Sequence, residues 1–339
     1  MFTIFWFISE GKDINIFWFK VIGAIMLDFI RRAVKLTALK AVYYSTSVGS
    51  GLSLTLINPW YITGFSDGEG CFHLAVNKHK RFKHGYSLGV SFKIHLHSRD
   101  LALLEKIKSY FGVGNIYKLK KGSIQYQITS INELKVIIDH FDKYPLVTSK
   151  WADYLLFKQG VELIQNKEHL TQEGLIKFLA IKASMNWGLS SNLVEAFPDI
   201  IPVERPLNQD YIIPHPFWLT GLIDAEGCFM IKKVNSSSVT GSGAHLDFQI
   251  TQHVRDANLM DSIAKLLDCG LIYKYREGVD FRVTKISDIM EKRISFLEKY
   301  PLKGVKLKDY KCFKEVGELI KNKEHLTPEG LKKKFNNWN

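Results

Sequence analysis

The strongest constraint on the fold is one short stretch that occurs twice in the chain. It reads Trp-Tyr-Ile-Thr-Gly-Phe-Ser-Asp-Gly-Glu-Gly-Cys-Phe at Trp60–Phe72 and Phe-Trp-Leu-Thr-Gly-Leu-Ile-Asp-Ala-Glu-Gly-Cys-Phe at Phe217–Phe229. A proline precedes each copy, Pro59 in the first and Pro216 in the second. Proline suits the first position of a helix, where the missing N–H would have had no partner. We therefore predict one short helix at each copy.

Small residues predict that these two helices pack against each other. Gly64 and Gly68 lie one helical turn apart in the first copy, and Gly221 and Ala225 do so in the second. Small residues with this spacing let two helix backbones approach closely, as in small-xxx-small packing. The expected result is one pseudosymmetric body rather than two domains on a tether.

The acids that end each predicted helix indicate chemistry. Glu69 and Glu226 lie where a negative charge opposes the helix dipole. Gly70 and Gly227 follow them, and we predict left-handed C-caps there. If the helices pair, the two carboxylates meet near a pseudo-two-fold axis, where divalent cations would neutralise their repulsion. An exposed acid in a capped turn is the alternative for one copy, but the same pattern in two copies argues for a metal site.

The rest of the chain repeats along with this stretch. Lys143-Tyr-Pro-Leu returns at Lys299, and Lys167-Glu-His-Leu-Thr returns at Lys323. Hydrophobic periodicity predicts the order α-β-β-α-β-β-α-α in each half. A duplicated domain accounts for this. We divide the chain into a hydrophobic, aromatic leader, a first repeat, a proline-containing linker and a second repeat: residues 1–50, 51–183, 184–213 and 214–339.

Both copies resemble the LAGLIDADG motif of homing endonucleases. Leu219–Gly227 is the nearer match and Ile62–Gly70 the looser one. Two copies in one chain resemble the monomeric branch, and the surrounding sequence, including Lys182–Ser190, is similar to the group encoded in fungal mitochondrial introns. The resemblance covers the chain from Ile57 onward. It implies an α+β fold of two pseudosymmetric αββαββα repeats, each with a four-stranded antiparallel sheet, joined at paired motif helices to form a DNA-binding saddle.

The composition is compatible with a nucleic-acid partner. The chain of 339 residues has a net charge of +12, which indicates a polyanion such as nucleic acid or an acidic membrane surface. Its four cysteines show no C-x-x-C spacing, which argues against a disulfide framework or a zinc site. The apolar run in the leader contains Lys20 and Asp28 and is short for a membrane span. We expect no stable membrane insertion, and we expect the leader to be dispensable for cleavage.

The predicted strands are rich in Lys, Arg and Gln, the side chains that can read base edges in a major groove. The basic turn between the first two strands could contact phosphates, or it could be a solvated hairpin tip. An ordinary solvated sheet face is the alternative for the strands themselves. The candidate DNA-binding residues are Lys78, Lys80, Arg81, Lys93, Lys118, Lys120, Gln125, Gln127, Lys232, Lys233, Gln249, Lys274, Arg276, Arg282 and Lys285.

The resemblance implies metal binding by the acid at the eighth motif position, which is Glu69 and Glu226 here, with two or three Mg²⁺ ions. It also implies a basic residue in a loop after a proline, which matches Lys150 and Lys306. Each lysine could instead be a surface residue that starts a helix. A glutamine at a strand end positions water in some members.

Gln252 fits that glutamine position, but its counterpart in the first half is Leu96. We therefore expect the two halves to cut unequally. His95, His97 and His253 could suggest metal ligands, but they lack paired acids. Base contact or structural hydrogen bonding is the better interpretation of these histidines.

The function that follows is a site-specific double-strand DNA endonuclease, active as a monomer in the mitochondrion. The resemblance implies that it cleaves a long pseudo-palindromic target by metal-assisted hydrolysis to give staggered ends, and so promotes intron homing. An intron RNA maturase of the same fold, with RNA as its partner, is one alternative. A non-catalytic DNA-binding protein is another. Retention of both glutamates favours cleavage.

Overall fold

The computed structural model describes residues 57–207, 211–235 and 242–324. The predicted leader, residues 1–50, lies outside these ranges, as does the end of the second predicted repeat. Contacts divide the chain into Met1–Leu56 and Ile57–Asn339, so both copies of the repeated stretch belong to one unit. Within the described residues, no helix has the length and apolar character needed to cross a membrane.

Each copy of the repeated stretch forms one helix, as predicted. Helix α2 spans Pro59–Glu69 and helix α8 spans Pro216–Glu226, and each begins with its proline. The residue before each proline caps the helix, because the Asn58 and His215 side chains accept hydrogen bonds from the backbone N–H groups of residues 60 and 217. Such caps satisfy donors that have no partner within the helix.

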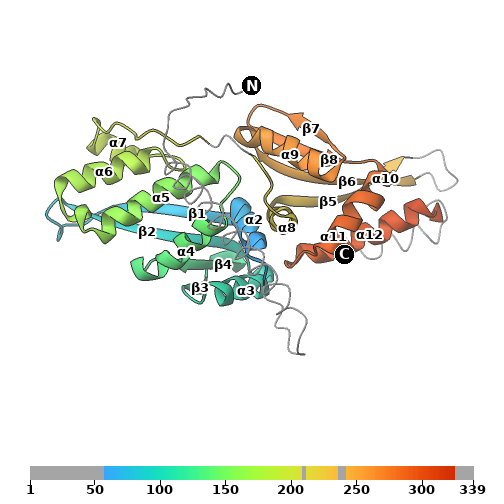
Figure 1. The fold of residues 1–339 in the computed structure, drawn as a ribbon, viewed down its shortest axis with the longest axis horizontal. Helices are drawn as coiled ribbons and strands as arrows, with labels where there is room; N and C mark the ends of the chain where they lie inside the picture. The colour runs from blue at the N-terminus through green and yellow to red at the C-terminus, as the bar shows by residue number, and fades with distance from the viewer. Residues whose placement is uncertain (1–56, 208–210, 236–241, 325–339) are drawn as a thin grey trace, which may run out of the picture. The chain divides into compact units, whose positions relative to one another are not determined.

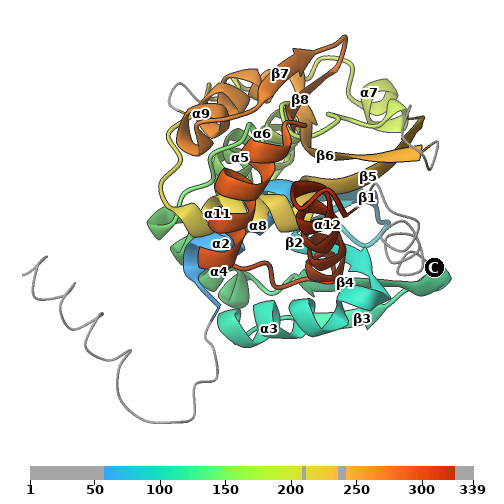
Figure 2. The ribbon, with the colours of Figure 1, turned by 90° about the vertical axis from the view of Figure 1, so that its right-hand side faces the viewer.

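The two motif helices lie side by side, as both views show (Figures 1 and 2). Their backbones touch at the glycines, where a Cβ on Gly64 would lie 1.8 Å from the Trp218 carbonyl oxygen. A Cβ on Gly221 would lie 2.1 Å from the Tyr61 carbonyl oxygen. No side chain fits at either position, which confirms the predicted packing of small residues.

The prediction of left-handed caps at Gly70 and Gly227 is wrong. Both glycines are extended, with φ of −70° and −71°, and each is the first residue of a strand. Glycine is needed there for space, because a Cβ would lie 2.6 Å from the carbonyl oxygen of Ser66 or of Ile223. The glycines therefore allow an immediate turn from helix to strand.

Each half contains a four-stranded antiparallel sheet, in the order β1-β2-β4-β3 and β5-β6-β8-β7. This confirms the predicted α+β architecture of two equivalent repeats. The strands are β1 Gly70–Lys78, β2 Tyr86–His97, β3 Asn115–Lys118, β4 Ser123–Ile128, β5 Gly227–Asn235, β6 Ser242–His253, β7 Leu271–Lys274 and β8 Gly278–Val283.

Helices cover one face of each sheet, α3, α4 and α5 in the first half and α9 and α12 in the second. The helices of the first half and the linker region are α3 Leu101–Phe111, α4 Ile131–Lys143, α5 Lys150–Gln165, α6 Gln172–Ala183 and α7 Ser191–Ala196. Those of the second half are α9 Ala257–Leu267, α10 Ile286–Asp288, α11 Ser295–Lys299 and α12 Lys306–Lys321.

The apolar core lies between each sheet and its helices, and Phe72 packs at its centre in the first half against the rings of Phe92, Phe141 and Phe157. The second half differs at the helix equivalent to α4, where a π-helical turn at Ile289–Ile294 separates α10 from α11. This turn places the Arg293 side chain inside the core.

Candidate active site and nucleic-acid interface

Glu69 and Glu226 end the paired helices and therefore meet where the two halves touch. A Cβ on Gly68 would lie 3.1 Å from Cγ of Glu226, so the Glu226 side chain reaches across to the other helix. Burial raises the pKa of Glu69, and the negative charge of Glu226 raises it further. The charges of the two acids that end the paired helices therefore act on each other in the fold.

Lys150 and Lys306 are the first residues of α5 and α12. The Lys150 ammonium donates to the carbonyl oxygens of Gly68 at 2.6 Å and Ser66 at 3.2 Å. The Lys306 ammonium donates to those of Ala225 at 2.9 Å and Ile223 at 3.4 Å. The last carbonyls of a helix have no partner within it and favour a cation.

Each of these lysines is therefore fixed against the motif helix of its own half, and both start helices as well. Burial lowers the pKa of both lysines, and the neighbouring carboxylates oppose that change. A lysine ammonium has three N–H donors. The two bonds that each ammonium makes to helix carbonyls leave a third donor for a group in the adjoining cavity.

The aspartates of the repeated stretch hold the loops that precede these lysines. Asp67 accepts hydrogen bonds from the backbone N–H groups of Val147 and Thr148 at 3.0 and 3.1 Å, from the Thr148 hydroxyl at 2.6 Å and from the Trp218 indole at 2.7 Å. Burial raises the pKa of Asp67 to about 6, and these donors oppose that change. The loop before Lys150 is thus tied to the helix that ends in Glu69.

Asp224 plays the equivalent part in the second half. It accepts from the N–H groups of Lys303 and Gly304 at 2.6 and 2.9 Å and from the Tyr61 hydroxyl at 2.6 Å. Our sequence reasoning assigned no role to either aspartate. Their occurrence at the same position in both copies was the signal that could have identified them.

Two cavities flank the paired helix ends. One of about 370 Å³ is lined by Glu69, Leu96 and Lys306, among others. The other, of about 510 Å³, is lined by Glu226, Gln252 and Lys150. Each cavity therefore combines the carboxylate of one half with the lysine of the other. Of these two cavities, only the second is lined by Gln252, whereas Leu96 lines the first.

The two glutamates fit a divalent metal ion as part of its ligand set. Hard divalent cations prefer carboxylate oxygens, and a cation would relieve the repulsion that raises the pKa of Glu69. Within the described residues, no group of three or more His, Cys, Asp or Glu side chains is arranged to hold a metal. The remaining ligands would then be backbone carbonyl, water or phosphate oxygens.

The histidines take structural roles or remain exposed. Nδ1 of His97 accepts a hydrogen bond from the N–H of Arg99, and Nδ1 of His253 accepts one from that of Arg255, both at 3.2 Å. His95 is exposed on β2. Structural hydrogen bonding, one of the two interpretations of these side chains, is confirmed for His97 and His253.

Several predicted DNA-binding residues share the sheet face opposite the helices. Lys93 pairs with Gln127, and Gln249 pairs with Arg282. Gln125 shares the face of Gln127, because side chains alternate along a strand. Buried core residues separate these positions along each strand. This face therefore presents Lys, Arg and Gln together in both halves.

Lys118 and Lys274 do not belong to this face, which corrects the prediction that grouped them with it. They pair with Ile124 and Val279, which are buried, and directly opposed residues point to the same side of a sheet. Both lysines therefore point to the helix-covered side of their sheets. They are exposed there because each ends a short edge strand.

The remaining candidates lie at the ends of strands. Lys78 ends β1, and Lys80 and Arg81 lie in the turn that follows it. Other exposed candidates in turns and strand ends are Lys120, Arg276 and Lys285. Lys233 belongs to β5, but its side chain falls outside the described residues.

A buried acid that sequence reasoning missed lies among the candidate DNA-binding side chains of the second sheet. Asp247 is fully buried and forms ion pairs with Lys232, at 2.7 Å, and with Arg282. Two candidate DNA-binding residues are therefore held together by one carboxylate. No local sequence signal distinguishes this aspartate.

Comparison with known proteins agrees with this geometry. The family model described as LAGLIDADG endonuclease matches residues 62–161 and 219–317. Probable intron-encoded endonucleases 3 and 2 of Neurospora crassa are 40% and 41% identical to the chain over 280 and 292 residues. These alignments cover 81% and 82% of this chain but 52% and 63% of the relatives, so the chain spans less than two thirds of their length.

A solved structure has the same fold. It is I-SmaMI bound to an uncleaved DNA target in the presence of calcium ions, and it superposes with a TM-score of 0.81 at 42% sequence identity. The match covers 83% of this chain and 97% of that one. Both repeats described above therefore have counterparts in a DNA-bound protein.

Proposed function

Because the chain belongs to the LAGLIDADG endonuclease family, we propose that it is a site-specific nuclease that cuts both strands of a long pseudo-palindromic DNA target. The observation that carries this proposal is the pair of Glu69 and Glu226, each beside a lysine fixed at a helix end. Its Neurospora crassa relatives are named as intron-encoded. The proposed role is therefore homing of the intron that encodes it, in the mitochondrion.

The two sheets are the proposed DNA-binding surface. Their outer faces carry Lys93, Gln127, Gln249 and Arg282, which match the donors and acceptors of bases in a major groove. The net charge of +12 favours binding to phosphates. Paired repeats in one chain would contact the two half-sites without a second copy, and the DNA-bound state of I-SmaMI supports this arrangement.

In the proposed mechanism, Glu69 and Glu226 would hold the cations, with Mg²⁺ as the expected metal and two or three ions in all. When bound, such ions would neutralise charge on the scissile phosphate and lower the pKa of bound water. Lys150 and Lys306 would direct their remaining N–H donors at phosphate oxygens and stabilise the charge of the transition state. Their bonds to helix carbonyls keep them in place beforehand.

The two cavities differ in how water can be held. The Gln252 amide can hydrogen-bond an attacking water, whereas Leu96 has no polar group at the equivalent position. We therefore propose that the strand served by Glu226, Lys150 and Gln252 is cut faster than the other strand.

The experiment is cleavage of a duplex that spans the exon junction formed when the intron encoding this chain is absent. Wild type is expected to cut both strands with Mg²⁺. Glu69→Gln and Glu226→Gln are expected to bind the duplex without double-strand cleavage. Glu162→Gln, which changes an exposed glutamate on α5, is the matched control and should cut like wild type.

If both motif variants cut like wild type, the paired-carboxylate mechanism is wrong. If wild type binds the intron RNA but leaves the duplex intact, an RNA maturase replaces the nuclease.

A further inference from the structure

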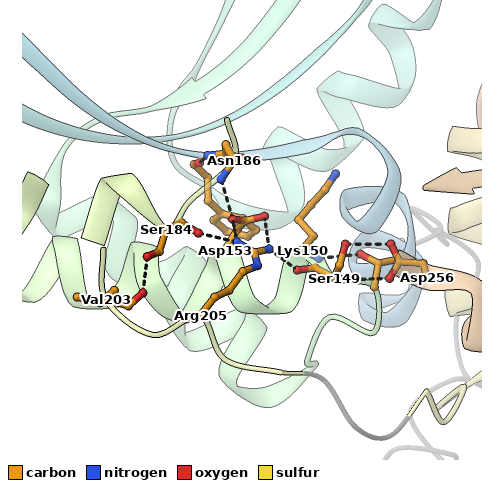
Figure 3. Close-up of polar contacts among 10 residues, drawn as sticks. Ser149, Lys150, Asp153, Ser184, Asn186, Val203, Arg205 and Asp256 are labelled. Carbon is orange, nitrogen blue, oxygen red and sulfur yellow. Dashed lines mark hydrogen bonds and ion pairs between the residues drawn. The ribbon is translucent and has the colours of Figure 1, made fainter. Parts of the chain in front are cut away.

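The residue before Lys150 is held by the opposite half of the protein. The N–H of Ser149 donates to Oδ1 of Asp256 at 2.6 Å, and its hydroxyl donates to Oδ2 at 2.9 Å (Figure 3). Asp256 is buried and precedes α9 in the second half. The second repeat therefore fixes the backbone that positions the lysine of the first.

An arginine from the segment between the halves, Arg205, also binds the start of α5. Arg205 donates to both carboxylate oxygens of Asp153, at 2.6 and 3.1 Å, in a forked ion pair. It also donates to the carbonyl oxygens of Ser149 at 3.0 Å and Ser184 at 2.9 Å (Figure 3). Forked arginine–carboxylate pairs are strong and fix geometry. Because Asp153 lies one turn beyond Lys150, Arg205 ties down the first turn of α5.

The second half has a weaker version of this arrangement. Val305 takes the place of Ser149 and has no hydroxyl, so Asp100 accepts only its N–H, at 2.9 Å. Asp309 takes the place of Asp153 and is exposed beside the other cavity. Within the described part of the chain, no ion pair joins Asp309 to a basic residue.

We propose that Asp256 and Arg205 are positioning residues for the site formed by Lys150, Glu226 and Gln252, and that, together with Gln252, they make this site the faster of the two. This inference rests on the proposed nuclease function. A lysine held in place before the substrate binds does not have to be ordered during the reaction. The segment between the repeats, which carries Arg205, thereby acts on one cleavage site and not on the other.

The test measures each strand separately. The exon-junction duplex carries a different fluorophore on each strand, and single-turnover nicking rates are measured with Mg²⁺. Arg205→Lys, Asp256→Asn and Ser149→Val should each slow one strand by about 10- to 100-fold and change the other less than about 2-fold. Ser149→Val is the mildest change, because it introduces the residue that the second half carries.

Reference variants identify the strand. Gln252→Leu should slow the same strand as Arg205→Lys, and Asp100→Asn should slow the opposite one. Lys158→Ala is the matched control, because it removes a different ion pair of α5, Lys158 with Asp142 at 2.6 Å. It should leave both rates unchanged.

The inference is overturned if the Arg205, Asp256 and Ser149 variants slow both strands equally, since a loss of stability alone would do that. It is also overturned if neither rate changes. In both cases wild type still cuts, and the proposed function stands. If wild type itself does not cut the duplex, the proposed function and this inference fail together.

Discussion

Replacing Arg293 with methionine is expected to stabilise the protein. This side chain is 1% exposed, and none of its guanidinium nitrogens has a hydrogen-bond partner among the described residues. Its guanidinium lies 4.2 and 5.0 Å from the ring centroids of Phe248 and Phe281. Burial lowers the pKa of Arg293 to about 9.

The expected gain in stability follows from the lowered pKa of Arg293 and from its contacts with the two phenylalanine rings. One pKa unit corresponds to about 1.4 kcal/mol, so a decrease of roughly three units or more disfavours the charged form by about 4–5 kcal/mol. Cation–π contacts with two rings offset about 1–2 kcal/mol of this. Methionine fills a similar volume without a charge, and the expected gain in the free energy of unfolding is about 1–4 kcal/mol.

The gain should depend on pH in a defined direction. The pKa of Arg293 is lower in the folded protein than in the unfolded chain. Above about pH 9 the folded protein therefore releases a proton that the unfolded chain retains, and wild type becomes more stable as the pH rises. The advantage of Arg293→Met is complete at neutral pH and shrinks above pH 9.

The assay is thermal and urea unfolding of the full chain at pH 7 and pH 10. Arg293→Met should raise Tm by about 2–4 °C for each kcal/mol gained. Arg293→Ala leaves a cavity and should gain less or lose stability. Lys292→Met, at the neighbouring partly exposed position, should change stability by less than about 1 kcal/mol. A lower Tm for Arg293→Met would refute the reasoning, because the guanidinium would then have a compensating partner.

Three further predictions concern the helix pair and the cleavage sites. Gly64→Ala should destabilise the protein by more than about 3 kcal/mol in thermal unfolding, because its Cβ would overlap the opposing backbone. Gly89→Ala, whose Cβ would meet only one side-chain atom at 3.8 Å, should be nearly neutral. Leu96→Gln should bring the two strand-nicking rates closer together. Trp187 is fully exposed, at 101%, and lines the cavity of Lys150. Trp187→Ala should weaken DNA binding about tenfold through the loss of aromatic stacking, without changing Tm.

Much of the fold was predictable because the same sequence pattern occurs in both halves of the chain. The repeated proline, small residues and acid predict two paired helices, and the alternating strands around them follow in both halves. The error at Gly70 and Gly227 has a physical origin. A glycine can be required by a positive φ or by lack of space, and sequence alone does not separate these causes.

The parts of the site that were missed depend on contacts distant in sequence. Asp67 and Asp224 repeat in both copies, so comparison of the halves could have identified them. Asp256 reaches Ser149 only because the halves pair. Arg205 occurs in a segment that has no second copy, and neither periodicity nor repetition indicates its partners.

The mixed composition of the cavities has an evolutionary consequence. Each cavity takes its carboxylate from one repeat and its lysine from the other. Exchange of one repeat with a relative by recombination would replace half of the proposed catalytic residues in each cavity. If these residues carry out the proposed cleavage, both repeats have to keep matching carboxylates and lysines. The side chains on the outer sheet faces belong to one repeat each, so under the proposed function the target sequence could diverge while the residues of the cavities are retained.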